Sequence, residues 1–255
     1  MDLRRADLGL GADYMITDRE RLEKSRVVIG DCTLYNDDCG FILGHTGPVD
    51  AVVTDPPYGI GAVQGGTIGS GNKQNPSTKF EKSDWDNQPV APALMAKIMR
   101  RGNWRIIFGG NYYPMPPARC WLVWDKLNSG DFADCELAWT NLDKAVRRIQ
   151  YRWNGMIRQN NERRGDHPTQ KPVGVMEWCI GHLPAAAVTI LDPFMGSGTT
   201  AVACVRMGRK FVGIEREKQY FDAACRRIEE EYSRPRLDLD RRSSELKAEQ
   251  MKLII

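Results

Sequence analysis

Apolar residues along this chain fall into short runs separated by polar segments, and the runs have two different periods. Runs of strand length, rich in β-branched and aromatic residues, predict strands at 26–30, 49–53, 104–108, 120–124, 135–139, 187–191 and 210–214. Segments in which apolar residues recur every three to four positions predict helices at 89–101, 173–183, 199–207 and 217–232.

The order of these elements predicts the fold class. Strands that alternate with helices indicate an α/β protein with a doubly wound, mostly parallel sheet covered on both faces. Residues 120–140 are the exception, because two strands follow one another closely there and predict an antiparallel hairpin at one edge of the sheet. The first strand is expected to end at Asp31 and Cys32, with Thr33 as a helix cap.

Composition places the chain among ordinary globular proteins. Its 255 residues are 42% hydrophobic and 27% charged, which suits one large domain. No apolar run approaches the length of a membrane span and the first residues lack a signal-peptide core, so a cytoplasmic protein is expected. Seven scattered cysteines without a C-x-x-C pair, and three widely spaced histidines, predict reduced thiols and no metal site.

The strand predicted at 49–53 ends in an unusual way. It runs into Asp55, Pro56, Pro57 and Tyr58. The prolines keep the backbone extended and supply no N–H, so the segment forms a stiff spur rather than a tight turn. The spur presents a carboxylate, a free carbonyl and an aromatic face, which together suit the exocyclic amine of a flat heterocycle. An ordinary turn after a strand is the alternative.

A second stretch has the features of a cofactor loop. The strand at 187–191 leads through a turn containing Gly196 and Gly198 into a helix whose first N–H groups are unpaired. No lysine follows the second glycine and the spacing is not G-x-G-x-x-G, which disfavours a nucleotide pyrophosphate. Glu215 ends the next strand, where a carboxylate can accept both hydroxyls of a ribose. S-adenosylmethionine is a nucleoside cofactor that fits this pattern.

Together these stretches resemble the amino-methylating (N6-adenine and N4-cytosine) DNA methyltransferases. Residues 55–58 are similar to the catalytic tetrapeptide of that family, 192–200 to its cofactor loop and Glu215 to its ribose acid. Residues 167–172 are similar to the segment that leads into the cofactor region, and 30–32 to the strand end that touches the cofactor adenine. The tetrapeptide precedes the cofactor loop, which resembles the circularly permuted β group.

The resemblance implies a Rossmann-like sheet of seven strands with one reversed strand. It divides the chain into an arm at 1–25, a methyltransferase domain at 26–232 and a charged tail at 233–255. It also implies catalysis by the residues of the spur, which are Asp55, Pro56, Pro57 and Tyr58. The cofactor residues that it implies are Asp31, Cys32, Asp55, Thr169, Lys171, Asp192, Phe194, Gly196, Gly198, Thr199, Thr200 and Glu215.

These cofactor residues have separate expected roles. The resemblance places Asp31 and Cys32 at the adenine, the loop at 192–200 around the methionine portion and Glu215 at the ribose. Thr169 and Lys171 are expected near the methionine carboxylate.

The chemistry of the target amine accounts for the spur. The exocyclic nitrogen is a weak nucleophile because its lone pair is delocalised into the ring. If Asp55 and the Pro56 carbonyl each accept one N–H, the nitrogen pyramidalises, and both acceptors stabilise the positive charge that develops there. The base must leave the duplex to reach them, and we expect it to stack on Tyr58.

A basic segment at about 144–166 is the predicted DNA-recognition region. Residues 144–171 hold eight basic and two acidic side chains, an excess of six that is larger than the net +3 of the whole chain. Such a segment suits the phosphates of double-stranded DNA. The expected DNA-binding residues are Arg147, Arg148, Arg152, Arg158, Arg163 and Arg164.

Several alternatives stay open. The product is expected to be N6-methyladenine, because an aspartate at the first position of the tetrapeptide is typical of the adenine enzymes, but an N4-cytosine enzyme poses the same chemical problem. A methyltransferase for RNA or for a protein amide is a further alternative, and so is a DNA-binding module without activity. Homodimerisation is open, and any restriction nuclease is expected to be a separate chain.

Overall fold

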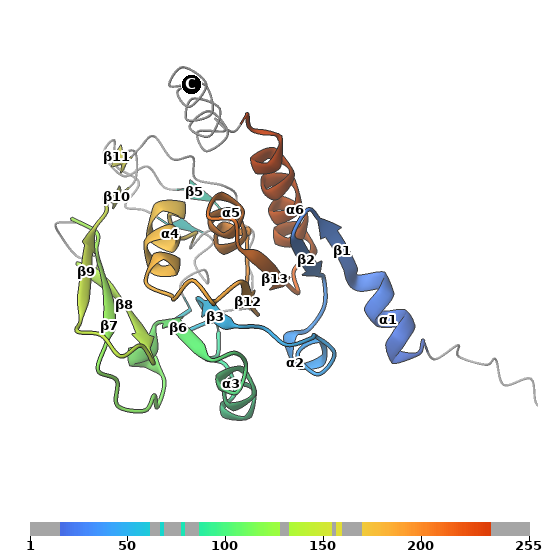
Figure 1. Ribbon diagram of the computed structural model, residues 1–255, viewed down its shortest axis with the longest axis horizontal. Helices are drawn as coiled ribbons and strands as arrows, with labels where there is room; N and C mark the ends of the chain where they lie inside the picture. Colours follow the sequence, from blue (N-terminus) through green and yellow to red (C-terminus); the bar gives the residue numbers. More distant parts are fainter. Residues whose placement is uncertain are drawn as a thin grey trace, which may run out of the picture.

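The protein is a layered α/β structure in which one large sheet separates two groups of helices (Figure 1). The computed structural model describes residues 16–61, 67–68, 78–79, 87–127, 133–154, 157–159 and 170–235. Within these residues the large sheet has nine strands in the order β1-β2-β13-β12-β3-β6-β8-β7-β9. The predicted fold class is confirmed.

Seven of the nine strands of the large sheet overlap the predicted apolar runs, and β2 and β9 do not. Their bounds are β1 Arg26–Ile29, β2 Cys32–Tyr35, β3 Ala51–Thr54, β6 Trp104–Phe108, β7 Trp121–Asp125, β8 Cys135–Thr140, β9 Arg147–Gln150, β12 Thr189–Asp192 and β13 Lys210–Ile214. Two small hairpins lie outside this sheet and are formed by β4 Thr67–Ile68 with β5 Thr78–Lys79, and by β10 Trp153–Asn154 with β11 Ile157–Arg158.

The helices lie on the two faces of the sheet. Figure 1 shows α4, α5 and α6 on one face, and α2 and α3 on the other. The bounds are α1 Asp18–Ser25, α2 Cys39–Ile42, α3 Pro92–Met99, α4 Val173–Gly181, α5 Thr199–Arg206 and α6 Lys218–Ser233, and a 3₁₀ turn, η1, spans Gly110–Tyr112. No helix of the described ranges is long and apolar enough to cross a membrane.

The central strands alternate side chains between two separate cores, as the period of a strand requires. On β3, Val53 joins the core beneath α4, α5 and α6, whereas Val52 joins the core beneath α2 and α3. On β6, Phe108 and Ile107 divide in the same way. Burial on both faces explains why these strands are short, continuous apolar runs.

The expected count of seven strands was too low for this chain. Seven strands, from β2 to β7 in the sheet order, form a unit in which β8 alone is reversed, because β8 pairs antiparallel with both β6 and β7. Two further strands extend this unit. β9 pairs parallel with β7 at one edge, and β1 pairs antiparallel with β2 at the other. The predicted hairpin of β7 and β8 is therefore real, but β9 occupies the edge beyond it.

The prediction for the first strand was wrong in one respect. The backbone turns at Gly30 and Asp31, and Cys32 begins a second strand, so Thr33 lies inside β2 and caps no helix. Gly30 has a φ of +53°, a conformation that glycine adopts without strain. The Asp31 N–H donates to the Tyr232 hydroxyl of α6 at 2.8 Å, which holds this turn against the end of that helix.

Candidate active site

Three acidic residues lie side by side at one edge of the sheet. Asp55 follows β3, Asp192 ends β12 and Glu215 follows β13, and these three strands are parallel neighbours. The carboxyl ends of parallel strands meet at the same edge, where open α/β sheets bind their ligands. Chain segments more than a hundred residues apart in the sequence are thus brought together.

The spur after β3 is held by aromatic residues from the segment after β6. The Tyr58 hydroxyl donates to the Asp55 carboxylate, and the Tyr113 hydroxyl donates to the Pro57 carbonyl. The Tyr58 ring stacks on Tyr112, with centroids 4.8 Å apart and an angle of 14° between the rings. Gly109 makes room for this arrangement, because a Cβ there would collide with the Tyr58 ring.

Lys171 holds the other side of the Asp55 carboxylate. Its Nζ lies 2.5 Å from Asp55 Oδ2 and 3.0 Å from Glu136 Oε2, a residue of β8. Burial raises the pKa of Asp55, with Glu136 adding to the rise and Lys171 opposing it. Burial acts against the charge of Lys171, but the two carboxylates outweigh it and raise the lysine pKa. Lys171 is therefore a cation at neutral pH, and it faces the Asp55 carboxylate.

Asp192 is a buried brace between the catalytic strand and the cofactor loop. Its carboxylate accepts the Thr54 hydroxyl at 2.7 Å, the Thr200 hydroxyl at 2.6 Å and the Phe194 N–H at 3.1 Å. Burial raises the pKa of Asp192 to about 6, although these hydrogen bonds act to lower it. The side chain thus fixes β3, β12 and the start of α5 relative to one another.

Glu215 closes the cofactor loop from the next strand. It accepts the Gly196 N–H at 3.0 Å and the Glu217 N–H at 2.7 Å. Burial raises the pKa of Glu215 to about 7. Gly198 has a φ of +77°, and a Cβ there would lie 2.9 Å from that of Ala224, so only glycine fits the turn. A tight glycine turn beside a carboxylate with free lone pairs suits the ribose of a nucleoside.

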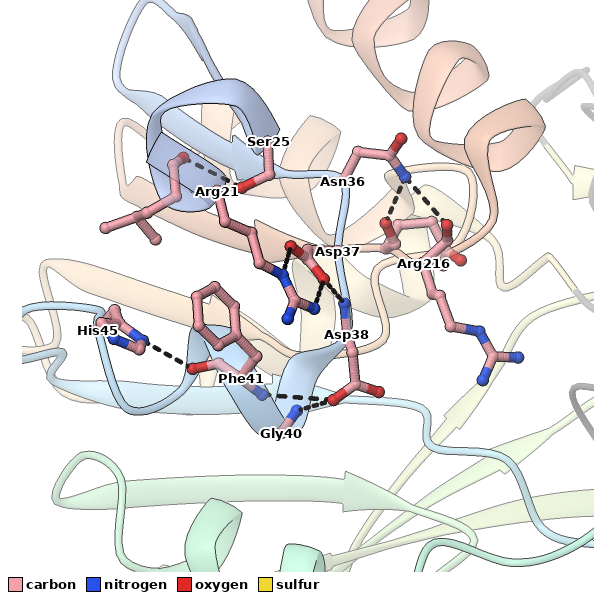
Figure 2. Close-up of polar contacts among 11 residues, drawn as sticks. Arg21, Ser25, Asn36, Asp37, Asp38, Gly40, Phe41, His45 and Arg216 are labelled. Atoms are coloured by element: carbon pink, nitrogen blue, oxygen red, sulfur yellow. Dashed lines mark hydrogen bonds and ion pairs between the residues drawn. The ribbon is translucent and has the colours of Figure 1, made fainter. Parts of the chain in front are cut away.

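The end of β2 completes the row on the far side of Glu215 (Figure 2). The Asn36 side-chain amide donates to the backbone carbonyls of Glu215 and Arg216, at 2.9 and 3.0 Å. Asp37 pairs with Arg21 of α1, whose Nε lies 2.8 Å from Asp37 Oδ2. Asp38 caps α2 by accepting two backbone N–H groups. This strand end therefore adds polar side chains to the rim of the cofactor loop.

Comparison with known proteins finds a family that part of the chain resembles. The sequence model of the DNA methylase family matches residues 122–226. Over these residues the chain is similar to that family. The match includes Lys171, Asp192 and Glu215, whereas the tetrapeptide at 55–58 lies before it.

Two relatives of the chain are type II methyltransferases. M2.LlaDCHI of Lactococcus lactis subsp. cremoris is 27% identical over 225 residues, which cover 71% of this chain and 82% of that protein. M2.DpnII of Streptococcus pneumoniae is 27% identical over 228 residues, with 72% and 83% covered. Among solved structures, M1.HpyAVI with SAM is 25% identical at a TM-score of 0.48, and 77% of this chain and 99% of that chain are covered. PvuII DNA methyltransferase (cytosine-N4-specific) is 17% identical at a TM-score of 0.48, with 77% and 86% covered.

Two residues expected at the cofactor lie elsewhere. Asp31 and Cys32 are at the turn between β1 and β2, and Cys32 pairs with Phe211 near the amino end of β13. Glu215 lies at the opposite end of that strand. The structure therefore does not bring Asp31 and Cys32 to the other cofactor residues, because the chain reverses at Gly30 and runs the length of β2 before it reaches the edge.

The strand end that lies beside Glu215 is that of β2, one hairpin further along the chain. Asp38 and Cys39 repeat the Asp-Cys pair of residues 31–32 shortly after β2 ends at Tyr35. The repeated dipeptide was the available signal, and only the turn at Gly30 distinguishes the two copies. Glu136 is a second residue that was missed, because nothing in the sequence around it indicates that it faces Lys171.

The basic segment lies partly within the described residues. Arg147 and Arg148 are exposed on the edge strand β9, and Arg152 is exposed just after it. β9 is parallel to β7 and ends at the same edge of the sheet as β3. Arg163, Arg164 and Thr169 lie outside the described residues, and the side chain of Arg158 is not described.

Proposed function

We propose that this protein transfers a methyl group from S-adenosylmethionine to the exocyclic N6 of an adenine flipped out of double-stranded DNA. The observation that carries the proposal is the pairing of two parallel strands. β3 presents Asp55, β12 leads into the glycine loop, and the Thr54–Asp192 hydrogen bond holds the two strand ends together. The motif order supports a place in the β group.

The residues of the loop fit the cofactor. The positive φ of Gly196 and Gly198 lets a ligand approach the backbone, and Glu215 offers a carboxylate to two ribose hydroxyls. Phe194, Thr199 and Thr200 line the same turn, and Asn36 ties the end of β2 to it. When bound, S-adenosylmethionine supplies an electrophilic methyl group on a sulfonium centre.

The protein groups act on the amine rather than on the methyl group. Asp55 accepts one amine N–H and the Pro56 carbonyl accepts the other, which releases the nitrogen lone pair from the ring. Both acceptors stabilise positive charge as it grows on the nitrogen, and no covalent enzyme intermediate is needed. Tyr58 offers its ring to the flipped base once the base enters. In the structure Tyr58 donates to Asp55 and stacks on Tyr112, so it must yield part of these contacts to the base.

Nucleoside analysis tests the reaction and the base together. DNA incubated with the protein and isotope-labelled S-adenosylmethionine is digested, and the nucleosides are separated by mass. We expect labelled N6-methyladenine with the wild type, none with Asp55→Ala, and the wild-type amount with Asp222→Ala, a matched aspartate on the surface of α6 that pairs with Lys218. A labelled N4-methylcytosine peak that disappears with Asp55→Ala would support the chemistry and contradict the choice of base.

Salt dependence tests the proposed DNA surface. Replacing Arg147, Arg148 and Arg152 with Gln is expected to weaken binding to every DNA sequence and to flatten its salt dependence by about 0.9 in slope for each phosphate that the protein no longer neutralises. The matched control is the Gln variant of three exposed arginines on α1, β1 and the end of α6, which are Arg19, Arg26 and Arg234. Equal slopes for the two triple variants would place the DNA surface away from β9.

A further inference from the structure

Four charged side chains of alternating sign form a chain that ends at the catalytic carboxylate. Asp55 pairs with Lys171, Lys171 pairs with Glu136, and Glu136 Oε1 lies 2.5 Å from Lys126 Nζ. Only 8% of the Lys171 side chain is exposed, and 21% of each carboxylate side chain. The four residues come from the end of β3, the end of β7, the start of β8 and the segment before α4. The chain of charges therefore crosses the reversed part of the sheet.

Such an arrangement is a costly way to stabilise a fold. Removing charges from water costs several kcal/mol for each ion, and a well-packed apolar substitute is often equally stable. Besides the two carboxylates, the rings of Phe108 and Tyr58 lie near Lys171, centred 5.3 and 5.8 Å from its Nζ. The ammonium group thus lies against Asp55 in a largely buried site, which indicates that it serves Asp55 and not only the fold.

Lys171 has two acidic partners, and their competition controls how strongly it acts on Asp55. An ammonium group that faced Asp55 alone would draw charge from the carboxylate and make it a weaker acceptor for the target amine. Glu136 draws part of this interaction away. Lys126 in turn compensates Glu136, and the two lysines lower the pKa of Glu136 to about 2 although burial acts to raise it. Glu136 is therefore a permanent anion that moderates the lysine.

We propose that Lys171 and Glu136 are positioning residues that together set the orientation and the charge of Asp55 for methyl transfer. The proposal rests on the function proposed above. Lys171 holds Asp55 Oδ2 and thereby directs Oδ1 toward the base site, where the Tyr58 hydroxyl now donates to it. Among the described residues, the other charged or titratable groups that face this carboxylate or its partners are Tyr58, Tyr113, Lys126, Cys179 and Asp192.

Two variants are expected to move the pH dependence of the reaction in opposite directions. Asp55 must be ionised to accept the amine N–H, so the rate rises with pH through its titration. Lys171→Met removes a cation and is expected to move this rise to higher pH by about one unit or more. Glu136→Gln leaves Lys171 to Asp55 alone and is expected to move the rise to lower pH. Both are expected to reduce the maximal rate.

Single-turnover methyl transfer at saturating cofactor and DNA, measured from about pH 5 to 9, gives the result. The control is Glu177→Gln, which removes a carboxylate of α4 that pairs with Arg206 away from the site, and its profile is expected to match the wild type. If both variants slow transfer by a constant factor at every pH, or move the rise in the same direction, Lys171 and Glu136 only support the fold and the inference is wrong.

Carbon NMR titration of the Asp55 carboxyl in the free protein separates this inference from the proposed function. The signal is assigned by its loss in Asp55→Asn. Opposite shifts of the titration midpoint in Lys171→Met and Glu136→Gln would support the control of charge whether or not the wild type is active. An inactive wild type would contradict the proposed function alone, whereas coincident midpoints would contradict the inference alone.

Discussion

The carboxylates at Asp55 and at Glu215 lie on the same edge of one sheet, but the protein holds them by different means. Asp55 has an ammonium group 2.5 Å away. Glu215 and its neighbour Asp192 instead accept backbone N–H and hydroxyl groups from the described residues. Asp55 is therefore balanced by a cation, whereas Asp192 and Glu215 have no ion pair among the described residues. That difference suits the proposed cofactor, whose positive sulfonium would itself supply the missing charge.

The largest effect is expected at Asp55, the proposed catalytic acid. Asp55→Ala removes an interaction that strengthens as the transition state forms, so turnover is expected to fall by about 10²-fold or more. Cofactor affinity, measured by calorimetry, is expected to change little, because Asp55 acts on the amine. Retention of more than about a tenth of wild-type turnover would show that the transition state does not depend on this carboxylate.

On the proposed cofactor side, replacing Glu215 is expected to affect cofactor affinity more than turnover. Glu215→Ala is expected to weaken cofactor binding by about 2–3 kcal/mol, because both ribose hydroxyls lose a charged acceptor. Turnover at saturating cofactor is expected to change less than it does in Asp55→Ala. Unchanged affinity in calorimetry would mean that the ribose acid lies elsewhere on this edge of the sheet.

The hydrogen bonds of Asp192, which join the two sides, are expected to contribute to the free energy of unfolding. Thr54→Val removes one hydroxyl donor from the buried Asp192 carboxylate and is expected to lower the free energy of unfolding by about 1–3 kcal/mol. Thr33→Val, on β2 and away from Asp192, is a strand control of the same size. Urea unfolding compares the two variants, and equal midpoints would show that the Asp192 hydrogen bond adds no stability.

The smallest expected effect is a pH dependence that belongs to the cofactor side. Burial places the pKa of Glu215 near 7, above its value in an unfolded chain. The free folded protein therefore binds this proton more readily than the unfolded chain, and the associated stability is lost as pH rises through about 7. The ribose hydroxyls prefer the ionised carboxylate, so cofactor affinity is expected to fall by up to about tenfold from pH 8 to pH 6. Glu215→Gln is expected to flatten this dependence in calorimetry.

The sequence predicts those parts of the molecule whose cause is local. The strands at Trp104–Phe108 and Lys210–Ile214 match their apolar runs to the residue, and the spur follows from Asp55 and two prolines. The hairpin at Gly30 was missed because residues 31–33 fit the end of one strand followed by a helix cap, whereas Cys32 begins a second strand.

The polar contacts of the site were less accessible from the sequence. Lys171 was expected at the methionine carboxylate, but it contacts Asp55, 116 residues away in the sequence, and Glu136 on the reversed strand. Pairing across the sheet depends on strand order, and the spacing of residues along the chain carries no information about it. β9 was missed for a related reason, because exposed arginines conceal the strand pattern of an edge strand.

The hydrogen bonds of Thr54 and Thr200 to Asp192 hold the end of β3, which carries Asp55, and the start of α5 on one carboxylate. Methyl transfer requires the nitrogen and the methyl carbon to meet on a line, and a displacement of about 1 Å can cost about 10²-fold in rate. A sheet that bends or twists thermally would vary this separation if its two strands moved independently. Because one carboxylate joins the two strand ends, we expect thermal motion to move the proposed donor and acceptor of the methyl group together.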